Sequence, residues 1–312
     1  MGNYAFGVDI GGTTVKIGLF DREGNLLDKW EIPTNTENKG ISILPDVAKS
    51  ILAKMEEKGI AEQDVAGIGV GAPGTVNEDG TLIGGAVNIG WDAFNIPEVM
   101  QAYIKVPVKA TNDANAAAYG EMWQGGGKGY ENMVAVTLGT GVGGGIIVNG
   151  QLLTGSVGAG GEIGHMHVQD GETEECGCKN KGCLEQYASA TGIVRLARRR
   201  LQKDDTPSVL REGTLSAKSV FDGVKAGDQV AIQIAEQFGE YLGKGLALVA
   251  DVVNPEIFVI GGGVSKAGEI LLTFVEPNFH KYVFPMCKNA KFALAKLGND
   301  AGIYGTAGLI LR

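Results

Sequence analysis

Three cysteines and a histidine stand close together in the middle of the chain, at a spacing that suits a metal ion. They are His165, Cys176, Cys178 and Cys183, written H-x₁₀-C-x-C-x₄-C. Zinc takes four nitrogen or sulfur ligands in a tetrahedron, and three cysteines with one histidine are typical of closed structural sites. Glycines and polar residues surround the thiols, which argues against three incidental cysteines. The pattern predicts a structural zinc ion, with His167 as the competing histidine ligand.

Two glycine-rich turns, each between expected strands, have the composition of phosphate-binding loops. Glycines let several backbone N–H groups converge on one anion, and threonine hydroxyls add further donors. A third glycine cluster follows an expected strand near the end of the chain. The predicted nucleotide-binding residues are Asp9, Gly11, Gly12, Thr13 and Thr14 in the first turn, Gly139, Thr140 and Gly141 in the second, and Gly261, Gly262 and Gly263 in the third cluster. Asp9 ends a strand, where its carboxylate could hold Mg²⁺ through water.

Two other nucleotide-binding motifs fail in this chain. Residues 139–144 match G-x-G-x-x-G, but residues 145–150 read as strand and turn, whereas a dinucleotide site needs a helix there. The P-loop pattern G-x-x-x-x-G-K-[ST] is absent from the sequence. The glycine turns therefore indicate another kind of phosphate site.

Asn112 and Asp113 stand between an expected strand and an expected helix. An aspartate at such a place is commonly a helix cap. It could also serve as a general base, and the two roles are compatible. The positive end of the helix dipole is expected to lower the pKa of Asp113 and make it a weak base.

Composition limits the class of protein. The chain has 312 residues, a net charge of −9 and a pI near 5.0. An acidic chain lacks the basic face that nucleic acid requires. No apolar stretch approaches membrane-spanning length, and no signal peptide precedes the first expected strand. The cysteines do not form the framework of a secreted protein, so the cytoplasm is the expected compartment.

The spacing of apolar residues and turns predicts an alternation of strands and helices in both halves of the chain. Each half opens with a strand, a glycine-rich turn and a second strand, which predicts an internal duplication with a cleft between two α/β lobes. The expected strands are Tyr4–Asp9, Val15–Phe20, Leu26–Ile32, Val65–Val70, Val106–Ala110, Asn132–Leu138, Gly145–Val148 and Glu256–Ile260. Helices are expected over 41–58, kinked or started by Pro45, and over 114–123 and 231–253.

These motifs together resemble the ROK family (repressors, open reading frames and kinases) of the actin–hexokinase superfamily. The matching segments are Asp9–Thr13, Gly71–Gly74, Asn112-Asp113, Leu138–Gly143, Gly161–His165, Gly182–Glu185 and Gly261–Gly263. The resemblance implies an actin-like, ribonuclease H-like duplicated fold with a cleft between two lobes. It implies a lobe of residues 1–112, a larger lobe of 113–301 with a zinc-binding segment at 162–185, and a helix at 302–312 packed back on the first lobe.

Within the family the chain is similar to the bacterial glucokinases. This likeness implies ATP-dependent transfer of phosphate to the 6-hydroxyl of glucose, with Asp113 as general base and Mg²⁺ accompanying ATP. It favours His165 over His167 as the zinc ligand. The residues carried over to the hexose are Asn112, Asp113, Glu162, His165 and Glu185, with Gly71 and Asn88 as further candidates. For Asn88 a turn role is an equal alternative. A homodimer or homotetramer is the expected assembly.

The sequence leaves other functions as alternatives. Another hexose (fructose, N-acetylmannosamine or allose) could be the acceptor, because specificity depends on a few hydrogen bonds. A sugar-sensing repressor would carry a DNA-binding segment ahead of the first turn, which begins here at Asp9. An ATPase that only changes conformation would not need the predicted sugar ligands.

Overall fold

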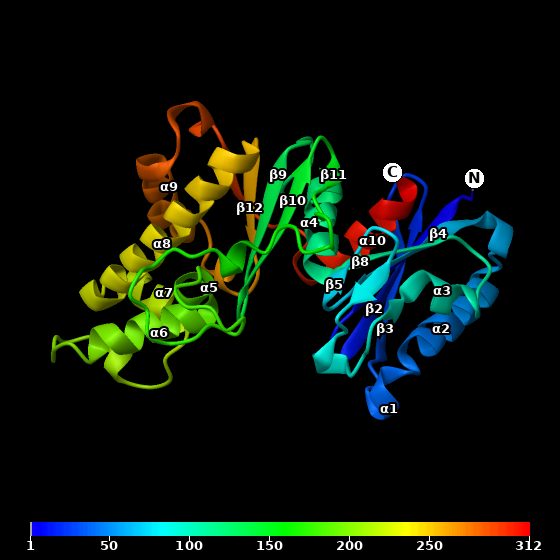
Figure 1. The fold of residues 1–312 in the computed structure, drawn as a ribbon, viewed down its shortest axis with the longest axis horizontal. Helices are drawn as coiled ribbons and strands as arrows, with labels where there is room; N and C mark the ends of the chain where they lie inside the picture. Colours follow the sequence, from blue (N-terminus) through cyan, green and yellow to red (C-terminus); the bar gives the residue numbers. More distant parts are fainter. Residues whose placement is uncertain (1) are drawn as a thin grey trace.

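Two α/β lobes make up the chain. The computed structural model describes residues 2–312. Each lobe is built on a five-stranded mixed sheet, and α4 (Asp113–Gln124) and α10 (Ala301–Leu311) lie between the lobes (Figure 1). Both termini lie on the first lobe (Figure 1). None of the helices within residues 2–312 is both long enough and apolar enough to cross a membrane.

The first lobe has the strand order β3-β2-β1-β4-β8. β1 runs antiparallel to β2 and parallel to β4, and β4 runs parallel to β8. Buried aliphatic side chains fill the space between the sheet and α2. The elements of this lobe are β1 (Tyr4–Ile10), β2 (Thr14–Asp21), β3 (Leu26–Pro33), α1 (Glu37–Gly40), α2 (Ile43–Lys58), β4 (Val65–Ala72), β5 (Thr75–Val76), β6 (Thr81–Ile83), β7 (Phe94–Asn95), α3 (Ile96–Gln101) and β8 (Val108–Asn112).

The second lobe repeats this topology with the strand order β11-β10-β9-β12-β13. β9 is antiparallel to β10 and parallel to β12, as β1 is to β2 and β4. The internal duplication predicted from the two strand–turn–strand units is therefore confirmed. The elements of this lobe are β9 (Met133–Leu138), β10 (Val142–Val148), β11 (Gln151–Leu152), α5 (Glu185–Ala188), α6 (Ala190–Leu201), α7 (Ala217–Lys225), α8 (Gln229–Val253), β12 (Ile257–Gly261), α9 (Ile270–Tyr282) and β13 (Lys291–Leu294).

Some boundaries differ from the sequence predictions. The strand expected at Val106–Ala110 occupies Val108–Asn112, two residues later, so the strand ends directly at Asn112. The strand expected to begin at Gly145 begins at Val142. The sequence indicates a turn at Gly143 and Gly144, but their backbones pair in register with β9. Pro45 lies in the first turn of α2, where a missing N–H costs no hydrogen bond.

Glycines let the backbone of α10 lie directly against its neighbours. A Cβ atom at Gly7 of β1 would lie 2.0 Å from the carbonyl oxygen of Ile303, and one at Gly305 would lie 1.7 Å from the carbonyl oxygen of Ala116 in α4. No side chain fits at such distances, so α10 is in backbone contact with both the first sheet and α4. The glycines thereby fix the position of α4 relative to β1.

A buried carboxylate reinforces this arrangement. Glu121 of α4 is 3% exposed and accepts hydrogen bonds from the backbone N–H groups of Gly126, Lys296 and Leu297 at 2.7, 3.0 and 2.8 Å. The last two residues lie in the segment that leads from the second sheet to α10. Glu121 thus ties together the two places where the chain passes between the lobes.

The substitution Gly305→Ala tests the contact between α10 and α4. Its methyl group would meet a backbone oxygen that cannot rotate away, so we expect a destabilisation of about 3 kcal/mol or more. The thermal midpoint of the purified variant, measured without ligands, would report this loss. Gly263→Ala is the matched control because its Cβ would meet no atom within 4 Å. Equal midpoints for the two variants would contradict the close contact.

Candidate active site

Where the lobes meet, two aspartates are close enough for the charge of one to affect the pKa of the other. Asp9 ends β1 and Asp113 begins α4. Burial and the charge of Asp113 raise the pKa of Asp9 from its ordinary 3.8 to about 6, against the opposing effect of Lys16. At pH 7 Asp9 is therefore mostly ionised, and by pH 5 it is mostly protonated. A carboxylate deprived of water beside a second carboxylate fits the vicinity of a cation.

The pKa of Asp113 is raised, so the predicted lowering by the helix dipole was wrong. Its side chain still reaches solvent, but the surrounding protein removes much of the water that would stabilise its charge. Hydrogen bonds from the N–H of Ala114 and from Asn112 oppose this effect without reversing it. Desolvation outweighs the helix dipole at this position.

Asn112 is the residue that caps α4. Its Oδ1 accepts from the N–H groups of Ala114 and Asn115 at 2.8 and 3.2 Å, and its Nδ2 donates to the carbonyl of Gly74 at 2.9 Å. Asp113 occupies the first helical position, where its Oδ1 also accepts from Ala114 N at 2.8 Å. The amide of Asn112 therefore holds Asp113 at a defined place.

The first glycine turn joins β1 to β2 beside Asp9. Gly11 N donates to the carbonyl of Thr14 at 3.0 Å, and the following Gly12 and Thr13 are exposed. Asn88, from the short 3₁₀-helix Val87–Ile89, lies next to this turn, since a Cβ on Gly12 would be 3.9 Å from its Nδ2. Exposed backbone N–H groups at the turn are available to an anion.

The second turn is held by hydrogen bonds from the first residues of α6. Ala190 N donates to the carbonyl of Gly139 at 2.8 Å, and Thr191 Oγ1 donates to the carbonyl of Thr140 at 2.6 Å. Sequence reasoning missed Thr191; the available signal was Ser189, a serine at the N-cap of a helix. Gly262 packs against the same strand, because its Cβ would lie 2.5 Å from the Leu138 carbonyl oxygen. The second turn and the third glycine cluster are therefore neighbours.

The predicted metal ligands converge. One ligand atom from each of His165, Cys176, Cys178 and Cys183 lies within 4.8 Å of the others. Two of the separations, Cys178 Sγ to Cys183 Sγ and Cys176 Sγ to His165 Nδ1, are 3.6 Å. Zinc–sulfur bonds of about 2.3 Å in a tetrahedron place neighbouring ligands roughly 3.7 Å apart, so the set fits zinc. Burial and the neighbouring thiols raise the pKa of Cys183 to about 12, which a bound cation would reverse.

The two histidines of this segment differ in what their ring nitrogens contact. His165 turns Nδ1 toward Cys176 and leaves Nε2 4.0 Å from a carboxylate oxygen of Glu162, whose side chain is 58% exposed. Both ring nitrogens of His167 are engaged elsewhere, with the carbonyl of Lys181 and the carboxylate of Asp170, each at 2.9 Å. His165 therefore fits the metal better than His167.

Two of the predicted sugar ligands have other contacts. Glu185 accepts from the Val142 N–H at 3.1 Å and from the Cys176 thiol at 3.2 Å, so its carboxylate links the second turn to the cysteine cluster. Gly71 is buried in β4, where a Cβ would lie 3.2 Å from the Ala116 methyl group. Close packing accounts for a glycine at position 71.

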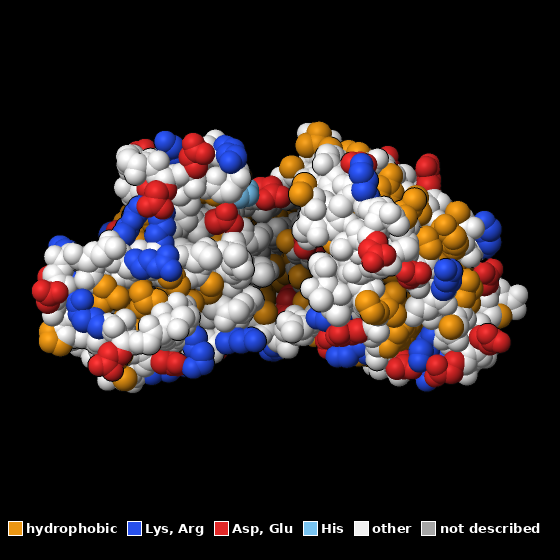
Figure 2. All heavy atoms as spheres, turned by 90° about the horizontal axis from the view of Figure 1, so that it is seen from below, with side chains coloured by type: hydrophobic (Ala, Val, Ile, Leu, Met, Phe, Trp, Pro, Cys, Tyr) orange, Lys and Arg blue, Asp and Glu red, His pale blue; other side chains and the backbone are white. Residues whose placement is uncertain are grey.

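The molecule is hollowed between its lobes, and acidic side chains and a histidine face the gap (Figure 2). One groove of about 1360 Å³ is lined by β8, α4 and residues 149–155, and it contains none of the predicted site residues. A smaller one of about 330 Å³ includes Thr140, Gly141, Thr191 and Glu185. The predicted site residues therefore lie outside the 1360 Å³ groove.

Comparison with known proteins agrees with this geometry. Residues 5–312 match the ROK family. The chain belongs to this family. It is 43% identical to a glucokinase of Halalkalibacterium halodurans over 97% of the chain and 94% of that protein, and 35% identical to a glucokinase of Streptomyces coelicolor over 97% and 96%. The crystal structure of a ROK family glucokinase from Streptomyces griseus in complex with glucose and AMPPNP matches with a TM-score of 0.74 and 34% identity over 98% of each chain. The actin-like two-lobe fold expected from the motifs is thereby confirmed.

The pKa of Asp9 gives a direct test of the carboxylate pair. In a ¹³C NMR titration of labelled aspartates, assigned with Asp9→Asn, we expect Asp9 to titrate near pH 6. Asp113→Asn removes the repelling charge, so the pKa of Asp9 should fall in that variant. The control Asp92→Asn alters an exposed carboxylate paired with Lys39 and should leave the titration unchanged. An unshifted Asp9 in Asp113→Asn would refute the coupling.

Proposed function

We propose that this chain transfers the γ-phosphoryl group of ATP to the 6-hydroxyl of glucose. The observation that carries the proposal is the placement of Asp113 at the start of α4, electrostatically coupled to Asp9 beside the first glycine turn. The glucokinase relatives and the related structure with glucose and AMPPNP support the choice of reaction and substrates.

Asp113 is the catalytic base in this proposal. Its carboxylate would accept a hydrogen bond from the 6-hydroxyl and orient the oxygen toward the γ-phosphorus. It would take the proton as the new O–P bond forms and the bond from the γ-phosphorus to the bridging oxygen breaks, which releases ADP. A raised pKa brings the carboxylate closer to the working pH and makes it a better proton acceptor than an ordinary aspartate. Because phosphoryl transfer has a loose transition state, correct positioning of the hydroxyl contributes more than its deprotonation.

The glycine turns hold the nucleotide. Exposed N–H groups and hydroxyls at Gly12, Thr13 and Thr140 would neutralise charge on the β- and γ-phosphates. The carboxylate of Asp9 would hold the Mg²⁺ of MgATP, through water, and the Mg²⁺ supplies further neutralisation of the phosphate charge. Gly262 and its neighbours pack beside Leu138 at the second turn, which suits them to the adenosine side of the nucleotide.

The hexose would lie between Asp113 and the cysteine segment. Glu162 lies beside Nε2 of His165, the ring nitrogen that is not turned toward Cys176, so both groups could bond sugar hydroxyls. Asn112 could offer a sugar hydroxyl only its second Nδ2 hydrogen, because its Oδ1 already accepts from Ala114 and Asn115. Glu185 would have to leave the Val142 N–H to reach a sugar, and Asn88 stands across the cleft beside Gly12.

A structural zinc ion completes the proposed site. His165, Cys176, Cys178 and Cys183 would hold it, and its chemistry is to cross-link a polar segment that has few apolar residues of its own. With Nδ1 on the metal, His165 would have its ring fixed and its Nε2 directed toward substrate. All four cysteines of the chain are free thiols, which suits a reducing compartment such as the cytoplasm.

We propose residues 1–112 and 113–301 as the two lobes, with the last helix returning to the first. In support, Ala118 and Met122 of α4 share a buried cluster with β9 of the second sheet, and Ile303 of α10 shares one with Phe20 of β2. Closure of the lobes over the sugar would exclude water from the transferred phosphoryl group.

Asp113→Asn tests the base. We expect its kcat with MgATP and glucose to fall about 100-fold or more, because the proton acceptor is lost. Coupled measurement of ADP release, against a panel of glucose, fructose, N-acetylmannosamine and allose, gives both the rate and the preferred hexose. ATP binding, followed by calorimetry, should be retained. Asp92→Asn is the matched surface control. Near-normal turnover in Asp113→Asn would exclude Asp113 as the base, and a preference for another hexose would correct the substrate.

Zinc removal tests the metal site. Elemental analysis should find one zinc per chain, and Cys183→Ser should lose it together with most hexose-dependent turnover. Cys287→Ser is the control, because Cys287 lies outside the cluster. A zinc content that survives Cys183→Ser, or wild-type protein without zinc, would contradict the site.

A further inference from the structure

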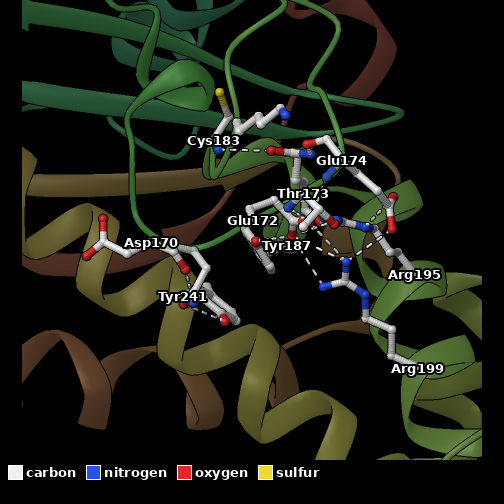
Figure 3. Close-up of polar contacts among 12 residues, drawn as sticks. Asp170, Glu172, Thr173, Glu174, Cys183, Tyr187, Arg195, Arg199 and Tyr241 are labelled. Carbon is white, nitrogen blue, oxygen red and sulfur yellow. Dashed lines mark hydrogen bonds and ion pairs between the residues drawn. The ribbon is translucent and has the colours of Figure 1, made fainter.

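A buried acidic residue lies in the loop between the histidine and the cysteines of the metal cluster. The side chain of Glu172 is 3% exposed, although the residues beside it in sequence are exposed and polar. Burying a carboxylate is costly unless charges and hydrogen bonds compensate it. Figure 3 shows that these compensating groups come from helices outside the loop.

Two arginines of α6 supply the opposite charge. Arg195 Nη2 lies 2.6 Å from one carboxylate oxygen of Glu172, and Arg199 Nη2 lies 3.1 Å from the other. The carboxylate also accepts from the loop's own backbone, at Thr173 N (2.9 Å) and Glu174 N (3.1 Å). Glu172 therefore folds the loop into a tight turn and fastens that turn to α6.

Aromatic stacking extends the anchor to α8. The hydroxyl of Tyr187 donates to Glu172, and the ring of Tyr187 stacks on Tyr241 with centroids 4.1 Å apart. Tyr241 in turn donates to Gln169 Oε1 at 3.1 Å, and the Arg195 guanidinium lies 5.4 Å from the centre of the Tyr187 ring. The loop is thus held at both Gln169 and Glu172.

The anchor is connected to a metal ligand by two hydrogen bonds. Gln186 Nε2 donates to the carbonyl of Glu174 at 3.0 Å, and Gln186 Oε1 accepts from the backbone N–H of Cys183 at 3.1 Å. Arg195 Nε also bonds the Glu174 carboxylate at 3.0 Å. A displacement of the Glu172 turn would therefore move Glu174 and, through Gln186, the backbone of Cys183.

We propose that Glu172 is a positioning residue that holds the metal-ligand loop on α6 and α8, independently of the metal, and thereby sets the affinity for zinc and for the hexose. This inference rests on the proposed function for its zinc and hexose readouts. None of Glu172, Arg195, Arg199 and Tyr187 belongs to the metal cluster, so the anchor persists when the metal is removed. Glu172 contacts neither glycine turn directly, so ATP affinity should depend on it less than hexose affinity does.

Glu172→Gln is the central test, because it keeps the shape of the side chain and removes its charge. Transfer of zinc to a chromogenic chelator should be about tenfold faster than in the wild type, because the backbone of Cys183 loses part of its support. The KM for glucose should rise by a larger factor than the KM for ATP. General destabilisation would lower the fraction of active protein and therefore kcat, but it would not change the two KM values by different factors. Glu175→Gln, the same charge change at an exposed neighbouring position, is the matched control.

Limited trypsin digestion tests the anchor without relying on zinc or activity. Lys179 and Lys181 are exposed in the loop, and cleavage after them should be faster in metal-free Glu172→Gln than in metal-free wild type. If the wild type lacks zinc or hexose turnover, the proposed function fails, while the digestion still decides the anchor. Arg199→Gln removes the outer, 44% exposed partner and should show a smaller increase, even if Glu172→Gln does not fold. The proposal is overturned if both variants are cleaved at the wild-type rate. If Glu172→Gln cannot be obtained, a wild-type cleavage rate in Arg199→Gln alone overturns it.

Discussion

The direct backbone contact of α10 with the first sheet and with α4 is the constraint on which the site depends. Gly7 and Gly305 allow carbonyl groups to lie where side chains would otherwise be. Because α10 holds β1 and the start of α4 in fixed relation, it also sets the relation of Asp9 to Asp113. A Cβ on Gly302, in the first turn of α10, would lie 2.5 Å from Asp9 Cγ, so the same helix closes off one side of that carboxylate. The burial that raises the pKa of Asp9 is a consequence of this packing.

The cysteine segment obeys a different constraint. With little apolar surface to bury, the loop cannot order itself by the hydrophobic effect. Polar interactions hold it instead, among them the converging side chains of His165 and three cysteines and the charge-compensated carboxylate of Glu172. Glu185 joins this segment to the second glycine turn through Val142. The cysteine segment and the second glycine turn are therefore physically connected.

Several features could be predicted from the chain because they depend on local residue types. The two strand–turn–strand units predicted the duplication, since glycine turns between apolar runs are a short-range signal. The spacing of His165 and the three cysteines predicted a convergent cluster for the same reason. The cap of α4 and the pKa of Asp113 were harder to predict: Asn112 takes the capping role, and desolvation by the surrounding protein outweighs the helix dipole. The support of Thr140 by Thr191 is a contact over 51 residues that carries no local pattern.

The sequence by itself determined the family, the two glycine turns and the close spacing of three cysteines with two histidines, because each is written in adjacent or closely spaced residues. Only the tertiary structure decided which of these groups meet. It brought Asp9 to Asp113 through α10, directed His167 away from the cysteines and toward Asp170, and buried Glu172 against two arginines. Burial and charge pairing depend on neighbours distant in the chain, and those neighbours are known only once the lobes have folded.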